Sequence, residues 1–588
     1  MSNFNWFYIQ FQMNRFNYLI FFFVIFYFSC QNSSDEFADL VITNAKVYTL
    51  SWDDPSSDGT PAQNAPIKDG TYVSDASVIV VSNENISEVI SDEDVSKYCG
   101  PNTIIIDAKG NYVLPGFIES HGHLNEIGEK KEAMKLQGLD GEEIIDLIVA
   151  KVKSKPKGEW LIASGWDEAA FANSYPDLNF LSSKTPDNPV VLIGLRGFGV
   201  MGNALAFQLA GITPSSIPPT GGEVLLDENQ QLKFVLLNQA KRLLLEKIPQ
   251  NSVSQQVRIM NYGFDELLTL GFTTTHHLGV DKLHMDAYQY LHQRDSLPMR
   301  VHAFVAARKY NLELVDEWLE KGPTKDDHSF LQVKGFKGYY DGSLGSRGAK
   351  FLESYSDREN HTGVSGIAYG FDENLIKKAL DKNFQLAIHA IGDKANRDVL
   401  NIYENYFKSN PDSKNLRHRI EHVQVVHPDD FSRFAELNIT ASVEPAHAVE
   451  DMPWAIDRVG LERAKGAYAW RTLRKNKAKM IFNSDFTGSD PSFFYGFFCA
   501  ITKQKKDGAV YYPEQKLTRE ETLRAYTIWG AYASGQEKLT GSIEKGKWAD
   551  FTIVDVDVLN ANPKAILNGK VLQTIVNGKV KYDAGLLD

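Results

Sequence analysis

Two histidines, His121 and His123, stand two residues apart just after an apolar stretch at 112–118 that is expected to form a short buried strand broken by Pro-Gly. In a strand, residues i and i+2 point to the same side. Two imidazoles on one side of a strand end can bind one metal ion. Barrel enzymes place their catalytic groups at the carboxyl ends of their strands. The spacing therefore predicts a catalytic metal at the end of a first barrel strand.

Four more residues of suitable chemistry follow in order, each at the end of a different predicted strand: Lys337, His389, His422 and Asp485. Each has an ordinary structural explanation when taken alone. A histidine in a strand is often a hydrogen-bonded core residue, a buried lysine usually pairs with a carboxylate, and an aspartate after a strand often caps a helix. The ordered set, His-x-His then Lys, His, His and Asp, favours a metal site.

The middle of the chain alternates strand-like and helix-like segments, which is typical of a (β/α)8 TIM barrel. This hydrolase domain is expected over 111–540, with an insertion at 125–265 over the barrel mouth, because one crossover helix needs far fewer residues. The predicted barrel strands are Tyr112–Ile118, Gly271–His276, Met299–Phe304, Gln332–Tyr340, Gln385–His389, Arg419–His422, Thr440–Val443 and Lys479–Asn483.

Both ends of the mature chain are rich in short β-like runs separated by turn residues. Such runs occupy 38–110 and recur in 541–588. Two β-rich ends around a long α/β middle predict one small β-sandwich domain built from both termini.

The first thirty residues differ from the rest. An unbroken apolar run at 18–28, with Arg15 before it and Cys30 after it, has the length of a signal peptide and is short for a membrane span. It resembles a bacterial lipoprotein signal over 1–30, cleaved before a lipidated Cys30 and followed by a polar tether at 31–37. Plain secretion and an uncleaved anchor are the alternatives.

Bulk composition excludes several classes of function. The net charge is −13 over 588 residues and no long basic stripe is present, which argues against a nucleic-acid partner. The three cysteines form no Cys-x-x-Cys pair, which argues against a thiolate zinc site.

The ordered ligands stand inside longer phrases that resemble the amidohydrolase superfamily, and within it the amidohydrolase 3 branch of metal-dependent hydrolases related to N-substituted formamide deformylase. The resemblance covers nearly all of 38–588. The phrases are Leu-Pro-Gly-Phe-Ile-Glu-Ser-His-Gly-His at 114–123, Gly-Trp-Asp-Glu at 165–168, Asp-Gly-Ser-Leu-Gly-Ser-Arg at 341–347, His-Ala-Ile-Gly-Asp at 389–393, Arg-Ile-Glu-His at 419–422 and Ser-Asp-Phe at 484–486.

The resemblance implies a divalent metal cofactor, expected to be Zn²⁺, at one or two ions per chain, although imidazole and carboxylate also suit Fe, Mn, Ni and Co. Lys337 matches a position at which the lysine amine of many family members carries CO₂ as a bridging carbamate. Asp485 matches the aspartate that contacts the first metal and acts as the catalytic base. The implied metal ligands are His121 and His123 for one ion, His389 and His422 for the other, with Lys337 and Asp485.

Five further residues are candidates for substrate contact. Trp166 and Asp167 come from the insertion, and His276 ends the second predicted strand. Arg347 could pair with a substrate carboxylate, or equally form a structural ion pair. His447 follows the seventh predicted strand, on a loop that commonly sets specificity.

The expected activity is hydrolysis of a C–N bond in a small amide, N-acyl or N-formyl compound by metal-activated water. The same site would also serve cyclic amides, esters or deaminated heterocycles. A catalytically inactive surface-binding lipoprotein is the alternative outside enzymes. The expected location is a bacterial membrane, reached through lipidated Cys30, and a homo-oligomer is compatible with the sequence.

Overall fold

A computed structural model describes residues 37–91, 94–132, 134–166, 175–194, 199–219, 222–345, 347–486 and 488–587. The predicted signal peptide at 1–30 and all but the last residue of the tether lie outside these ranges, as does Asp167. Within them, no helix combines the length and the apolar character needed to cross a membrane.

Eight parallel strands form the centre of the molecule, in the order β22-β21-β20-β19-β18-β17-β16-β9. Most of their residues are buried, as expected of parallel strands covered by helices; all seven residues of β17 are buried, for example. The strands are β9 (Phe117–Gly122), β16 (Phe272–Val280), β17 (Arg300–Ala306), β18 (Leu331–Tyr339), β19 (Gln385–Ala390), β20 (Arg419–His422), β21 (Thr440–Val443) and β22 (Lys479–Phe482). The predicted α/β barrel is confirmed.

The first predicted strand is divided between two sheets, which corrects the single strand expected over 112–118. Tyr112–Pro115 (β8) pairs with β2 (Lys46–Val47) and β23 (Phe551–Val554), whereas β9 begins at Phe117 and joins the barrel. Gly116 lies between them, and a Cβ there would come within 2.2 Å of the Thr273 hydroxyl. The close approach of β16 therefore requires glycine where the chain passes from one sheet to the other.

The barrel is nearly closed by the segment that follows β22. The Asp485 amide donates to the carbonyl of His121 at 3.0 Å, and the His123 amide donates to the carbonyl of Phe486 at 3.0 Å. Gly122 and Phe486 form a parallel bridge between these bonds. The seam thus passes through three of the predicted metal ligands and holds their backbones in register.

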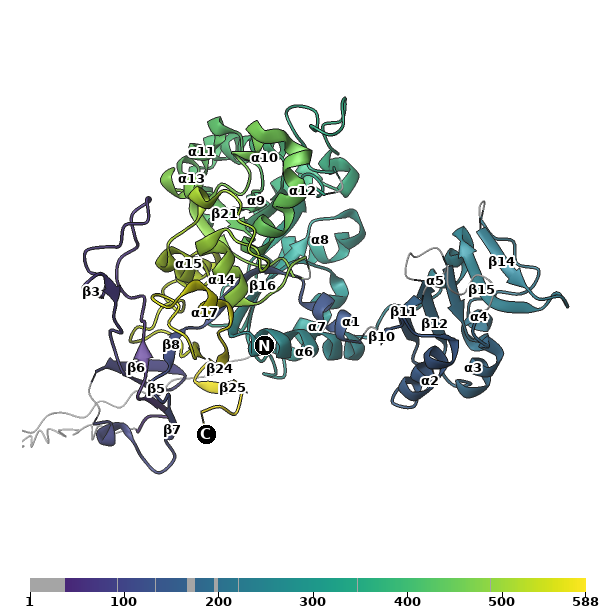
Figure 1. The fold of residues 1–588 in the computed structure, drawn as a ribbon, viewed down its shortest axis with the longest axis horizontal. Helices are drawn as coiled ribbons and strands as arrows, with labels where there is room; N and C mark the ends of the chain where they lie inside the picture. The colour runs from purple at the N-terminus through teal and green to yellow at the C-terminus, as the bar shows by residue number, and fades with distance from the viewer. Residues whose placement is uncertain are drawn as a thin grey trace, which may run out of the picture.

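Helices surround the barrel strands and form the outer layer of the central body (Figure 1). They are α6 (Val253–Thr269), α7 (Lys282–His292), α8 (Leu312–Lys321), α9 (Glu373–Asp381), α10 (Asp393–Ser409), α11 (Phe431–Glu436), α12 (Pro445–Ala464), α13 (Trp470–Lys475), α14 (Phe493–Thr502), α15 (Arg519–Ala525) and α16 (Ile528–Ser534).

The insertion after β9 forms a lobe that stands apart from the barrel in Figure 1, joined to it through α1 (Leu124–Glu132) and α6. Its sheet has the order β10-β11-β12-β13-β15-β14 and encloses its own apolar clusters. The apolar residues of these clusters all come from the lobe itself, so it has a core separate from that of the barrel. Its elements are β10 (Met134–Lys135), α2 (Gly141–Val152), β11 (Leu161–Trp166), α3 (Leu178–Lys184), β12 (Val190–Gly194), β13 (Gly199–Gly202), α4 (Ala204–Leu209), β14 (Gly222–Leu226), β15 (Leu232–Asn238) and α5 (Arg242–Leu245).

The two chain ends meet on the opposite side of the molecule from this lobe (Figure 1). One sheet has the order β6-β5-β1-β7 and the other β2-β8-β23-β24-β25, and side chains from both contribute to one apolar cluster. The other strands and the helix of these two terminal segments are β1 (Leu40–Thr43), β3 (Ile67–Lys68), β4 (Thr71–Tyr72), β5 (Val78–Ser82), β6 (Asn85–Ile90), β7 (Ile104–Asp107), α17 (Pro563–Leu567), β24 (Val571–Val576) and β25 (Lys579–Asp583).

Candidate metal centre

His121 and His123, at the carboxyl end of β9, both face Asp485. Nε2 of His121 lies 3.4 Å and Nε2 of His123 lies 3.2 Å from the same oxygen, Oδ1 of Asp485. His121 is buried, whereas the side chains of His123 and Asp485 are each about a fifth exposed, at 22% and 21%. The structure therefore brings these three predicted ligands together at the edge where solvent and substrate can reach them.

Lys337 projects from β18 into the same space. Its side chain is buried, and Nζ lies 3.2 Å from Nε2 of His121. Burial lowers the pKa of this amine to about 8, because the charged form loses its hydration. A larger fraction of neutral amine is therefore present near neutral pH than for an ordinary lysine.

His389 on β19 and His422 on β20 complete the predicted set. Their ring centroids are 4.4 Å apart, and the centroid of His422 lies 5.1 Å from that of His121. His422 has φ of 76° and Asp485 has φ of 46°, a left-handed conformation that is unfavourable for non-glycine residues. Such strain clusters at functional sites, where the surrounding structure holds it in place.

A carboxylate stands behind each of three ligand histidines. Oε2 of Glu421 lies 2.8 Å from Nδ1 of His121, and Oε1 of Glu444 lies 3.2 Å from Nδ1 of His422. Oδ1 of Asp341 lies 3.4 Å from Nε2 of His389. Carboxylates in this position fix the ring orientation and the tautomer of metal-binding histidines.

None of these three carboxylates was assigned a role from the sequence, although each lies next to a predicted strand end or inside a phrase shared with the family. Glu444 is the first residue after the predicted strand Thr440–Val443, the kind of position that identified the other ligands. Glu421 precedes His422 directly, and Asp341 opens a phrase shared with the family. A strand-end position thus marks Glu444 as a candidate in the sequence, whereas the contact of Glu421 with His121 depends on the closed barrel.

The donor set fits a divalent metal. One ligand atom from each of His121, His123 and Asp485 lies within 4.8 Å of the others, and the same holds for His121, His422 and Glu444. Among the described residues, Nε2 of His389 and Oε1 of Glu444 are buried and form no well-directed hydrogen bond, although Asp341 and His422 lie 3.4 and 3.2 Å from them. Buried polar atoms are nearly always hydrogen-bonded, so two such atoms beside a cluster of imidazoles fit a site for a metal ion.

Burial lowers the pKa of His121 and of His389 well below the usual value, so both rings are neutral, as metal ligands must be. Burial alone would raise the pKa of Asp485, but His121, His123 and His422 hold it well below its usual range. The site therefore combines neutral nitrogen donors with an ionised carboxylate.

The predicted substrate residues are scattered. His447 lies beside the ligands, with Nδ1 3.7 Å from Oε2 of Glu444, whose hydrogen bond and charge raise the histidine pKa to about 9 against the opposing effect of burial. His276 is fully buried and accepts from Arg419 at 3.0 Å. Arg347 forms the structural ion pair, at 2.9 Å from Asp357.

Trp166 lies in the interior of the lobe instead of at a pocket wall. Its side chain is fully buried in the lobe's apolar cluster, and Nε1 donates to the carbonyl of Leu192 at 2.8 Å. Packing within the lobe therefore accounts for this residue in the structure.

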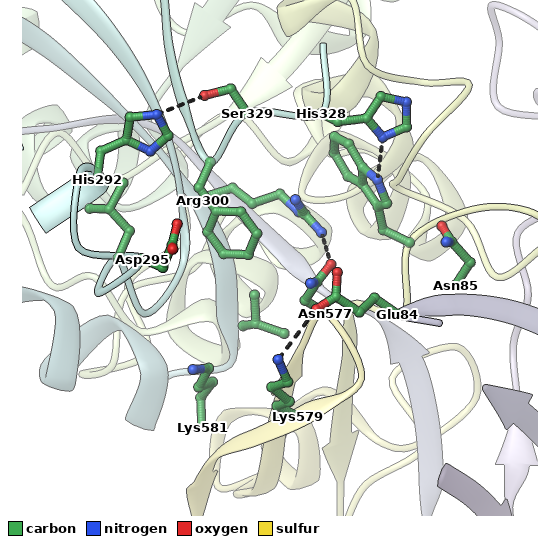
Figure 2. Close-up of a pocket in the computed structure, with 14 residues that line it drawn as sticks. Glu84, Asn85, His292, Asp295, Arg300, His328, Ser329, Asn577, Lys579 and Lys581 are labelled. Carbon is green, nitrogen blue, oxygen red and sulfur yellow. Dashed lines mark hydrogen bonds and ion pairs between the residues drawn. The ribbon is translucent and has the colours of Figure 1, made fainter. Parts of the chain in front are cut away.

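A cavity of about 420 Å³ lies at the other end of the barrel (Figure 2). It includes Arg300, the first residue of β17, so it opens at the amino ends of the strands. Figure 2 shows Arg300 directed at Asn577, to which it donates at 2.9 Å. Because none of the predicted ligands lines it, this cavity is separate from the metal centre.

The comparisons with known proteins agree with this geometry. The model of the Amidohydrolase family matches residues 105–582. The chain belongs to the amidohydrolase family. The resemblance inferred from the sequence phrases is thereby confirmed, and this amidohydrolase is a metal-dependent hydrolase of that superfamily.

Relatives of the amidohydrolase span nearly its whole length. The putative amidohydrolase YtcJ of Bacillus subtilis is 31% identical over 83% of this chain and 92% of its own. The N-substituted formamide deformylase of Arthrobacter pascens is 24% identical over 93% of this chain and 98% of its own. A metal-dependent hydrolase from Pyrococcus furiosus has a crystal structure with a TM-score of 0.67 and 26% identity, covering 89% of this chain and all of that one.

Proposed function

We propose that this amidohydrolase cleaves a C–N bond in a small amide, N-acyl or N-formyl compound. The observation that carries the proposal is the convergence of His121, His123 and the ionised Asp485 within 3.4 Å at the carboxyl end of the barrel. The similarity to an N-substituted formamide deformylase supports this class of bond.

The proposed metal ligands are Asp485 and the five basic residues predicted with it: His121, His123, Lys337, His389 and His422. A metal bound there would polarise the carbonyl of the substrate and lower the pKa of the attacking water. In this proposal Asp485 does the proton transfer. Its Oδ1 accepts the proton of the attacking water and returns it to the nitrogen of the leaving amine. The pKa of Asp485 lies well below the usual range, so this carboxylate is ionised near neutral pH.

We further propose that Lys337 carries a carbamate. The neutral amine attacks CO₂, an N–C bond forms and one proton leaves, which converts a neutral side chain into an anionic one with two oxygens. Nζ lies 3.2 Å from Nε2 of His121, a ligand of the first ion, and β19 with His389 is the neighbouring strand. An anion at this position can bridge two cations that a free ammonium would repel.

Metal analysis and a substrate panel test these proposals together. Purified protein is assayed against N-acyl and N-formyl compounds with zinc and bicarbonate, before and after chelation. About two zinc ions per chain would support the bridged site, and one would support a mononuclear site. Turnover only of cyclic amides, esters or heterocycles would overturn the bond assignment. A chain that holds no metal and turns over nothing would instead favour an inactive binding lipoprotein.

We propose that the amidohydrolase is exported and anchored to a bacterial membrane through lipidated Cys30. The support is the apolar run at 18–28, its flanking Arg15 and the polar residues after Cys30. Labelling with radioactive palmitate should mark the wild type and leave Cys30→Ser unlabelled. Equal labelling of both, or labelling of neither, would overturn the lipid anchor.

A further inference from the structure

A buried ion pair lies directly beneath the metal centre. Arg419 and Glu421, two residues apart on β20, both have fully buried side chains inside the barrel. We propose that this pair is a positioning device that fixes the ring orientation and the tautomer of His121. The inference rests on the proposed metal-dependent function and identifies which residues of this chain prepare its ligand.

Glu421 makes the contact that determines the tautomer. Its Oε2 lies 2.8 Å from Nδ1 of His121. A carboxylate paired with a guanidinium is ionised and can only accept hydrogen bonds. Nδ1 of His121 therefore carries the proton, and the lone pair of Nε2 faces Asp485 and Lys337, 3.4 and 3.2 Å away. That is the form of the ring that can bind a metal.

Arg419 in turn fixes Glu421 with two parallel bonds. Its Nε donates to Oε1 at 2.8 Å and its Nη2 donates to Oε2 at 2.9 Å. This bidentate geometry defines the plane of the carboxylate as well as its position. Rotation of Glu421 away from His121 would break two charge-assisted bonds in a dry interior.

Arg419 also contacts three other barrel strands. Nη2 donates to the carbonyl of Ser120 at 2.7 Å and lies 3.2 Å from the hydroxyl of Ser442, while Nη1 donates to Nδ1 of His276 at 3.0 Å. Ser120 directly precedes His121. The guanidinium thus fixes both the backbone and, through Glu421, the ring of His121. The hydrogen bond to His276 helps to hold the guanidinium itself in position.

The chain provides a matched control two residues earlier. Arg417 forms the same bidentate bond with Glu537, at 2.7 and 2.6 Å, but their side chains are 22% and 25% exposed. Glu537 contacts none of the ligand histidines. Replacing it removes an arginine–glutamate pair without touching His121.

The test measures metal affinity rather than turnover. Zn²⁺ binding to purified holoprotein is followed by competition with a chromogenic chelator, in Glu421→Gln, Glu537→Gln and the wild type, with circular dichroism as a check of folding. Glu421→Gln is expected to lose affinity by about 10- to 100-fold, the usual effect of losing such a partner. Glu537→Gln should match the wild type.

A double variant separates positioning from simple damage. Glu421→Gln leaves the Arg419 charge buried without a partner, so its effect could arise from that charge. Arg419→Met with Glu421→Gln removes both charges, and the loss of affinity should persist because an amide, which can donate as well as accept and is no longer held by Arg419, does not fix the tautomer or the ring of His121. Recovery of wild-type affinity in the double variant, or no loss in Glu421→Gln, would overturn the inference. A wild type that binds no divalent metal would overturn the proposed function together with it.

Discussion

Buried charged and polar side chains occur at both ends of the barrel, but they are bonded to one another at the amino end and directed at a common space at the carboxyl end. At the amino end, Arg300 bonds to Asp550 at 2.8 Å and to Asn577 at 2.9 Å, and its guanidinium lies 3.6 Å from the ring centroid of Trp548. At the carboxyl end, two histidines and Asp485 converge around one space, while Oε1 of Glu444 and Nε2 of His389 form no well-directed hydrogen bond among the described residues.

This difference shows where stability and function reside. A buried charge whose partners are all within the protein holds the fold together, and nothing further can bind to it. Donors directed at a common space, with some of their lone pairs unmet, stabilise the fold less but can bind an ion or substrate. Substitutions at the amino end should therefore change stability, and substitutions at the carboxyl end should change chemistry.

The largest expected effect is at the carboxyl end. Asp485→Asn keeps the shape of the side chain but removes the base, so kcat should fall by about 10³- to 10⁴-fold, the contribution of a well-placed acid–base group with its electrostatics. Steady-state assays on any accepted substrate measure this. Asp490→Asn is the matched control, because Asp490 lies on the same loop and pairs with Lys506 at 2.9 Å. Full turnover by Asp485→Asn would remove Asp485 from the mechanism.

The next effect is at the amino end. Arg300→Met leaves Asp550 buried without its cation, and the free energy of unfolding should fall by about 3–5 kcal/mol. The KM and kcat of the folded enzyme should stay unchanged, because Arg300 is at the far ends of the strands. Urea unfolding and assays on the same preparation measure both quantities.

Lys579→Met provides the control for Arg300→Met. Lys579 lines the same cavity but is exposed, with Glu84 3.3 Å away, so its loss should cost less than about 1 kcal/mol. If Arg300→Met lowered kcat at unchanged stability, the proposed separation between the two ends would be wrong.

Local sequence patterns were sufficient to predict the barrel and to identify candidate ligands. Strand-like runs located seven of the barrel strands and the start of the first, and residues at their ends, such as Lys337 and His389, gave the candidate ligands. Both features depend on neighbouring residues only. The boundary at Gly116 was missed because it depends on how closely Thr273, far away in sequence, approaches the chain.

Features that depend on long-range packing could not be predicted in this way. Glu421 and His121 are 300 residues apart, and only the closed barrel brings them to 2.8 Å. Trp166 stood in a phrase typical of the family, but its own lobe buries it. Its burial follows from the packing of several distant segments, which no local pattern records.

The smallest expected effect concerns a histidine at the amino end whose nitrogens are both satisfied. His418 directly precedes β20, its Nδ1 accepts from the Leu386 amide at 3.0 Å, and its Nε2 lies 3.1 Å from the Ser413 hydroxyl. Burial lowers its pKa from 6.5 to about 3, so the folded state keeps the ring neutral while the unfolded state takes up a proton. The stabilisation is therefore complete above pH 6.5 and is lost progressively as the pH falls toward 3.

His418→Gln retains an acceptor and a donor but does not titrate. Its deficit in unfolding free energy relative to the wild type should shrink by about 1 kcal/mol between pH 7 and pH 5.5, since each pH unit below the unfolded pKa is worth about 1.4 kcal/mol. Urea unfolding of both proteins at several pH values measures the difference. A deficit that stays constant over this range would mean that His418 takes up a proton as readily in the folded state as in the unfolded state, and that the amino end does not keep its histidine neutral as the structure indicates.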